Sequence, residues 1–84
     1  MIYTLHKNAP TFPAERVAYE GIEYARKNAI RLIERGRTKV VYILDSNKVL
    51  TGKVFKGEKT LFYRDYKKAI VREIRKDGST VSYR

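Results

Sequence analysis

The chain contains no cysteine and no tryptophan, one histidine and two prolines among its 84 residues. Without cysteine, neither a disulfide nor a thiolate metal site can form, so packing alone must stabilise the fold. A zinc site is excluded as well, because zinc needs three or four protein ligands and His6 is the only histidine. We therefore expect no metal and no cofactor.

Long apolar runs are also absent from the chain. No stretch approaches the roughly 20 apolar residues that are needed to cross a bilayer. The first residues, MIYTLHK, lack the basic start and apolar segment of a secretory signal. We expect no contact with a membrane and, given the lack of cysteine, a cytoplasmic protein.

Basic residues are abundant and unevenly distributed. Residues 1–36 carry six Lys/Arg and four Asp/Glu, whereas residues 37–84 carry thirteen and five, which gives a net charge of +10. Such a large excess of positive charge favours polyanionic partners, of which nucleic acid is the commonest. A hydrophobic fraction of 43% argues against disorder, and a chain this short predicts one domain over residues 1–84.

The strongest helical pattern covers residues 14–35. Apolar residues recur there at steps of three or four and predict a buried stripe made of Ala18, Ile22, Ala25, Ala29, Leu32 and Ile33. Pro13 suits the first position of such a helix, and Gly36 suits the position just after its end. Three alanines on the stripe predict close approach to a sheet.

Several short segments have strand character. Residues 38–44, 49–55 and 60–63 are rich in β-branched and aromatic residues and are separated by turn-forming clusters. Residues 2–6 alternate as a short strand would, although an ordered arm fits equally well. Gly52, inside the second segment, indicates a bulge or a close packing contact.

Residues 65–76 fit either a helix or a strand. We prefer a strand that returns through a two-residue Asp77-Gly78 turn, because residues 79–83 otherwise have no partner. This hairpin places Ile74 opposite Val81, Arg72 opposite Tyr83 and Glu73 opposite Ser82. The predicted fold class is α+β, with one long N-terminal helix packed on an antiparallel meander of three to five strands.

The best candidate contact surface is the basic and aromatic run at residues 62–68. Proteins that bind single-stranded nucleic acid combine cations near the phosphates with aromatic rings on which bases stack. The alternative is that the aromatic residues are core and the cations only solvate a turn. The wider predicted site consists of Lys53, Lys56, Lys59, Arg64, Tyr66, Lys67, Lys68, Arg72, Arg75 and Lys76.

No reaction motif accompanies this basic surface. Residues 52–60 resemble a phosphate-binding P-loop, but Glu58 stands where the lysine should follow the second glycine, so we reject that site. The sequence predicts a non-enzymatic module that binds DNA or RNA mainly through the phosphate backbone. The alternative is an inhibitor or adaptor, of the type made by viruses and mobile elements, that docks its basic face on an acidic protein. A toxin-type ribonuclease that uses Tyr, Lys, Arg and Glu is a third hypothesis.

Overall fold

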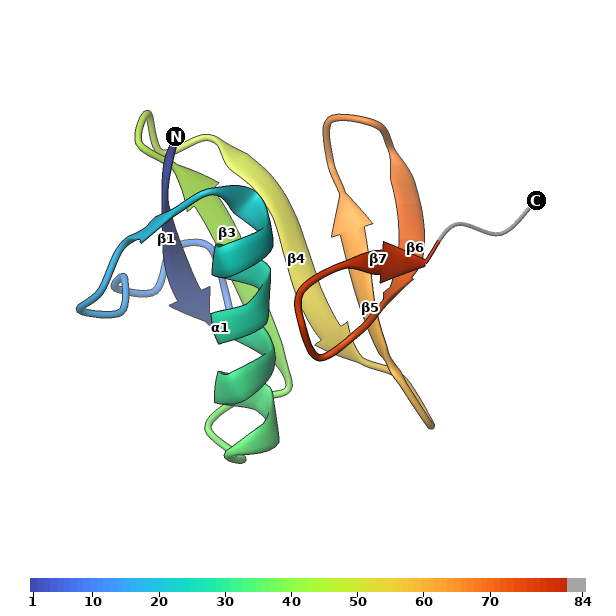
Figure 1. Cartoon of the computed structure of the whole chain (residues 1–84). Coiled ribbons are helices and arrows are strands. Elements are labelled where there is room, and N and C mark those ends of the chain that lie inside the picture. The colour runs from blue at the N-terminus through green and yellow to red at the C-terminus, as the bar shows by residue number, and fades with distance from the viewer. Residues whose placement is uncertain (82–84) are drawn as a thin grey trace.

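A computed structural model describes residues 1–81 of the chain. Within them it contains one helix, α1 (Ile22–Glu34), and seven strands: β1 (Ile2–Lys7), β2 (Tyr19–Glu20), β3 (Val40–Asp45), β4 (Leu50–Lys56), β5 (Leu61–Asp65), β6 (Ile70–Ile74) and β7 (Thr80–Val81). The strands form one antiparallel sheet in the order β2-β1-β3-β4-β5-β6-β7, curved into a half-barrel. Helix α1 packs against one face of this sheet (Figure 1).

The predicted architecture is therefore wrong in two respects, although the α+β class is right. The sheet has seven described strands, not three to five, and the helix is neither long nor N-terminal, since two strands precede it. The helix begins eight residues later than predicted, because residues 14–20 run back along the free edge of β1. There the Glu15 N–H donates to the Leu5 carbonyl at 2.8 Å, and His6 forms a bridge with Ala14.

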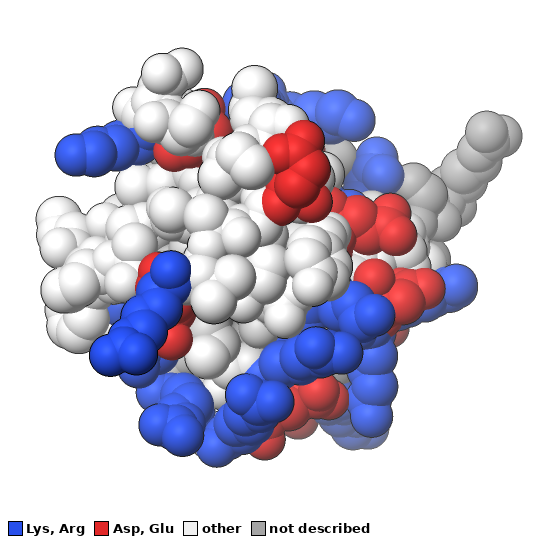
Figure 2. Space-filling view, turned by 60° about the vertical axis from the view of Figure 1, so that its left-hand side comes forward, with Lys and Arg blue, Asp and Glu red and all other residues white. Residues whose placement is uncertain are grey.

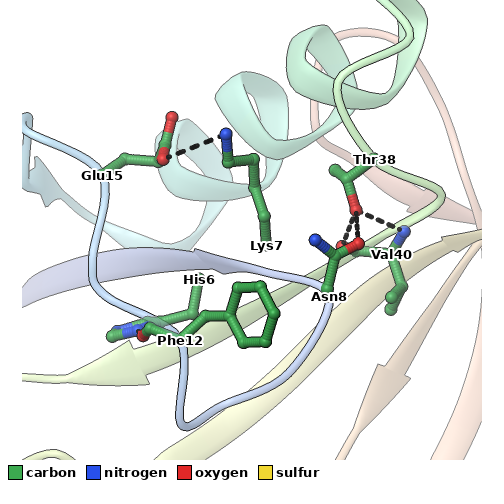
Figure 3. Close-up of polar contacts among 7 residues, drawn as sticks. All are labelled: His6, Lys7, Asn8, Phe12, Glu15, Thr38 and Val40. Atoms are coloured by element: carbon green, nitrogen blue, oxygen red, sulfur yellow. Dashed lines mark hydrogen bonds and ion pairs between the residues drawn. The ribbon is translucent and has the colours of Figure 1, made fainter.

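Residues 14–20, termed the arm below, bind backbone groups of β1 that would otherwise be left without partners. Gly21 then ends the extended segment with a φ of 86° and starts the helix. Ala18, predicted to be buried, is consequently exposed. Side-chain contacts hold both ends of the loop that leads from β1 into the arm: Thr38 Oγ1 donates to Asn8 Oδ1 at 3.0 Å, and Lys7 pairs with Glu15 at 3.8 Å (Figure 3).

The helical prediction is confirmed from residue 22 onward. Ala25, Ala29 and Ile33 are buried against the sheet as expected, together with Ile30, which the predicted stripe omitted. The end of the helix is also as predicted. Gly36 has a φ of 75° and its N–H donates to the Ile33 carbonyl, while the Arg37 N–H donates to the Leu32 carbonyl, which is the Schellman arrangement.

Strand predictions in the middle of the chain are confirmed within one or two residues at most ends, and residues 70–74 form a strand. The predicted hairpin exists, but its register is wrong by one residue: Ile74 pairs with Thr80, and Glu73 with Val81. Five residues, 75–79, connect the strands in place of a two-residue turn. The loop is wider because it reaches α1, where Gly78 packs against the Glu23 carbonyl and accepts a hydrogen bond from Arg26 Nε at 2.7 Å. Ser82 and Tyr83 lie outside the described residues.

The core lies between α1 and the facing side chains of the central strands. Leu5, Val41, Ile43 and Val54 are at most 1% exposed and alternate along β1, β3 and β4. Because successive side chains in a strand point to opposite faces, the residues between them must lie on the face turned away from the helix. That face, termed the outer face below, has no helix over it (Figure 1).

Candidate nucleic-acid interface

Two rows of side chains cross the outer face from strand to strand. Strand pairing aligns His6, Tyr42, Lys53, Arg64 and Val71 in one row, and Val40, Phe55, Phe62, Glu73 and Val81 in the next. Antiparallel strands bring such neighbours to within about 5.5 Å of one another. The outer face is therefore a mixed aromatic and basic surface.

Two aromatic rings flank one lysine on this surface, and a third ring stacks on one of them. Lys53 Nζ lies 5.7 Å from the centre of the Tyr42 ring and 5.2 Å from that of Phe55. Phe55 and Phe62 stack with their centres 5.7 Å apart and their planes inclined by 27°. All four side chains are partly exposed, so each ring is held by its neighbours and still presents surface to solvent. We refer to Tyr42, Lys53, Phe55, Phe62 and Arg64 as the outer platform.

The platform continues into the turn between β5 and β6. Arg64 pairs with Lys53 across the strands, and its guanidinium carbon lies 5.2 Å from the centre of the Tyr66 ring. Asp65 Oδ1 accepts hydrogen bonds from the backbone N–H groups of Lys67 and Lys68, at 2.9 and 3.0 Å. These bonds shape the turn, in which the side chains of Lys67 and Lys68 are exposed, and Lys68 also lines a pocket on the helix-facing side of the sheet.

Four other predicted cations gather elsewhere. Lys56, Lys59, Arg75 and Lys76 line a groove of about 480 Å³ between the end of α1, the β4–β5 turn and the loop 75–79. Its apolar wall comes from Ile33, Leu61 and Ile74, and Lys76 Nζ lies 3.7 Å from Glu34 Oε2. Figure 2 shows Lys and Arg side chains concentrated at the end of the molecule where α1 finishes. We call this the basic groove.

The tenth predicted residue, Arg72, lies in neither place. It pairs with Tyr63 on the helix-facing side of the sheet and contributes to a small polar pocket together with Arg26. Burial raises the pKa of Tyr63, and the neighbouring Arg26 charge only partly opposes that shift. The phenol at this pocket is therefore neutral, and a hydrogen-bond donor, near neutral pH.

His6 is a structural residue of the outer face. Its Nδ1 lies 2.7 Å from the Phe12 carbonyl oxygen (Figure 3). Its Nε2 lies 2.8 Å from Thr4 Oγ1, so both ring nitrogens have partners. Because a carbonyl can only accept, Nδ1 carries the proton in the neutral ring and Nε2 accepts from the hydroxyl. The imidazole thereby fixes the loop at residues 8–14 to β1.

Reasoning from the sequence missed Tyr42 and Phe55 as surface residues. Tyr42 lies between the buried Val41 and Ile43, and Phe55 follows the buried Val54, so the alternation carried the signal. The continuous apolar and aromatic run at residues 40–44 concealed it, because such a run is typical of a strand that is covered on both faces. If only one face of the sheet is covered by a helix, the alternation places both rings on the uncovered face.

Comparisons with models of protein families, with curated proteins and with solved structures found no match to this chain. Among residues 1–81, no three His, Cys, Asp or Glu side chains lie close enough to hold a metal ion. The only helix in that part of the chain is too short and too polar to cross a bilayer. Functional inference therefore depends on the geometry of the surface.

Proposed function

We propose that this protein binds single-stranded nucleic acid on its outer platform. The observation that carries the proposal is a group of three rings on an uncovered sheet face: Tyr42 and Phe55 flank Lys53, and Phe62 stacks on Phe55. Unpaired bases stack on exposed aromatic rings, whereas the bases of a duplex are already stacked on one another. Lys53 and Arg64 lie among and beside the rings, where they can neutralise phosphates of the same strand.

The remaining cations support this proposal because they surround the outer platform with positive charge. Lys67, Lys68 and the basic groove add positive charge beyond the ends of the platform, and this charge attracts any polyanion regardless of its sequence. Contacts with the phosphate backbone are thus expected to supply most of the affinity, with ring stacking selecting unpaired strands. The proposed role is binding without catalysis, in the cytoplasm.

Fluorescence anisotropy with labelled DNA and RNA strands of about 12 nucleotides, at about 150 mM salt, tests this proposal. Phe55→Ala should weaken binding of either strand by about 5- to 150-fold, since loss of one stacked base costs roughly 1–3 kcal/mol. Val71→Ala is the matched control, because Val71 is 50% exposed on the same face but lies outside the platform. Circular dichroism must show that both variants are folded.

Three results would contradict the proposal. They are equal affinity for duplex and single strand, equal loss of affinity in Phe55→Ala and Val71→Ala, and no binding at this salt concentration. The third would favour the alternative of an acidic protein partner, which affinity capture from nuclease-treated lysate would then identify. Recovery of cleaved strands would instead favour the ribonuclease hypothesis.

A further inference from the structure

A small polar pocket lies on the helix-facing side of the sheet, away from the outer platform. It has a volume of about 180 Å³ and is enclosed by the first half of α1, by β5, β6 and β7, and by the turn at residues 66–69. Its lining comprises Arg26, Tyr63, Asp65, Lys68, Ile70, Arg72 and Thr80. Three cationic side chains from three separate elements therefore share one pocket with a single carboxylate.

The described lining of this pocket carries a net positive charge, because three cations share it with one carboxylate. No carboxylate within residues 1–81 forms an ion pair with Arg26, Lys68 or Arg72. Asp65, the one acidic residue in the lining, directs Oδ1 to the backbone of its own turn. Arg26 and Arg72 are also partly buried, so each guanidinium has lost some hydration while lying near a like charge. A bound anion would compensate for the lost hydration and for the repulsion between the like charges.

The donors of the pocket are held in place before any ligand arrives. Arg26 Nε donates to the Gly78 carbonyl at 2.7 Å, and its guanidinium lies 4.9 Å from the centre of the Tyr63 ring. Tyr63 is only 4% exposed, and Arg72 is its direct partner on the neighbouring strand. Thr80 adds a hydroxyl from β7. Guanidinium groups and hydroxyls arranged in this way are typical ligands of phosphate oxygens.

We propose that this pocket binds a phosphate group, with Arg26, Arg72 and Lys68 as charged ligands and Tyr63 and Thr80 as hydroxyl donors. The group belongs either to inorganic phosphate or to the terminal phosphate of a nucleic-acid strand, since the chemistry of recognition is the same. The proposal does not depend on the outer platform, which lies on the opposite face of the sheet.

Titration of the isotope-labelled protein with inorganic phosphate, against chloride at matched ionic strength, tests the pocket by NMR. We expect saturable shifts of the Arg26 Nε–H signal and of the backbone N–H signals of Gly78 and Thr80. Arg72→Gln should weaken phosphate binding about tenfold or more, because a charge-assisted hydrogen bond is lost. Arg31→Gln makes the same charge change at an exposed site on α1, outside the pocket, and should leave the affinity within about twofold.

Lys68→Gln, at an exposed turn position, provides a second variant that does not endanger folding, and it should weaken binding severalfold. Absence of a saturable shift at about 100 mM phosphate would overturn the proposal, as would equal losses in Arg72→Gln and Arg31→Gln. Folded Arg72→Gln and Lys68→Gln proteins that bind like the wild type would overturn it too.

The source of the phosphate is distinguished with two oligonucleotides that differ only in a terminal phosphate or hydroxyl. Tighter binding of the phosphorylated strand, abolished by Arg72→Gln, assigns the pocket to strand ends. Equal binding of the two strands, alongside binding of inorganic phosphate, assigns it to a small phosphate ligand. Phe55→Ala should weaken both strands equally and leave binding of inorganic phosphate unchanged, so failure of the outer platform is recognisable separately.

Discussion

The Tyr63 side chain lies directly against the backbone of Gly52, in the space that a Cβ at that position would occupy. A Cβ built on Gly52 would overlap the hydroxyl and ring of Tyr63. The two residues lie on adjacent strands, since Gly52 pairs with Asp65 and Tyr63 with Val54. Next to this contact, Thr51 has no pairing partner where the β3–β4 register shifts between Ile43 and Leu44. The missing side chain at residue 52 is thus what allows Tyr63 to be buried under the helix.

Gly52→Ala should lower the free energy of unfolding by about 1–3 kcal/mol, because an added methyl group forces apart atoms that are already in contact. Urea denaturation measures this loss. The matched test is the same substitution in a Tyr63→Leu background, where the overlapping ring and hydroxyl are both absent and the added cost should be smaller. Strictly additive losses would show that the two residues are not coupled.

Stability should fall at high pH because of Tyr63. Burial raises the pKa of this phenol above its ordinary value of 10.0, so the folded state holds the proton more tightly than the unfolded state. The stabilisation is complete below about pH 10 and is lost as the pH rises through the folded-state pKa. Tyr63→Phe should make the alkaline decline in thermal stability shallower, and identical pH profiles would contradict this assignment.

The corrected start of the helix gives a sharp comparison between two alanines. Ala25→Glu places a charge at a site with no exposed surface and should cost several kcal/mol, enough to unfold a domain of this size. Ala18→Glu, at an exposed position of the arm, should change stability by no more than about 0.5 kcal/mol. Similar melting temperatures for the two variants would be incompatible with this fold.

Salt dependence should separate the platform from the basic groove. If phosphates contact Lys53 and Arg64, replacing both with glutamine should reduce the magnitude of the log–log salt slope for a single strand by about 1.4, or roughly 0.7 per contact. Replacing Lys56 and Lys59 makes the same charge change in the groove and should alter the slope less. Equal changes in the salt slope for the two double variants would indicate that the strand responds to the overall positive charge and does not follow a defined path over the platform.

Local features of this fold were predictable from the sequence. The apolar spacing of residues 22–33 and the position of Gly36 gave the helix and its end, and the β-branched segments gave the central strands. The start of the helix was not predictable, because residues 14–20 carry a plausible helical pattern but pair with the edge of β1. Pairing between distant segments depends on which backbone groups lack partners, and a local pattern does not record that.

The candidate site was predictable in composition but not in arrangement. All ten predicted residues were chosen by type and proximity in the chain, and the fold distributes them among the outer platform with its adjoining turn, the basic groove and the small polar pocket. Lys53 and Lys56 illustrate the reason. They are three residues apart on one strand and therefore point to opposite faces. Counting charges along the chain does not reveal on which face of the sheet a residue lies, whereas the alternation of side chains along a strand does.

The order of strands in the sheet has a kinetic consequence. Strands β3 to β6 are successive neighbours joined by short turns, so their pairing brings together residues that are close in the chain. Strand β1 instead pairs with β3, and a connection containing the arm and all of α1 must close before Leu5 can meet Ile43. Closing that longer loop costs more conformational entropy. We therefore expect the β3–β6 hairpins to form first during folding, with β1 and the helix joining them afterwards and completing the core.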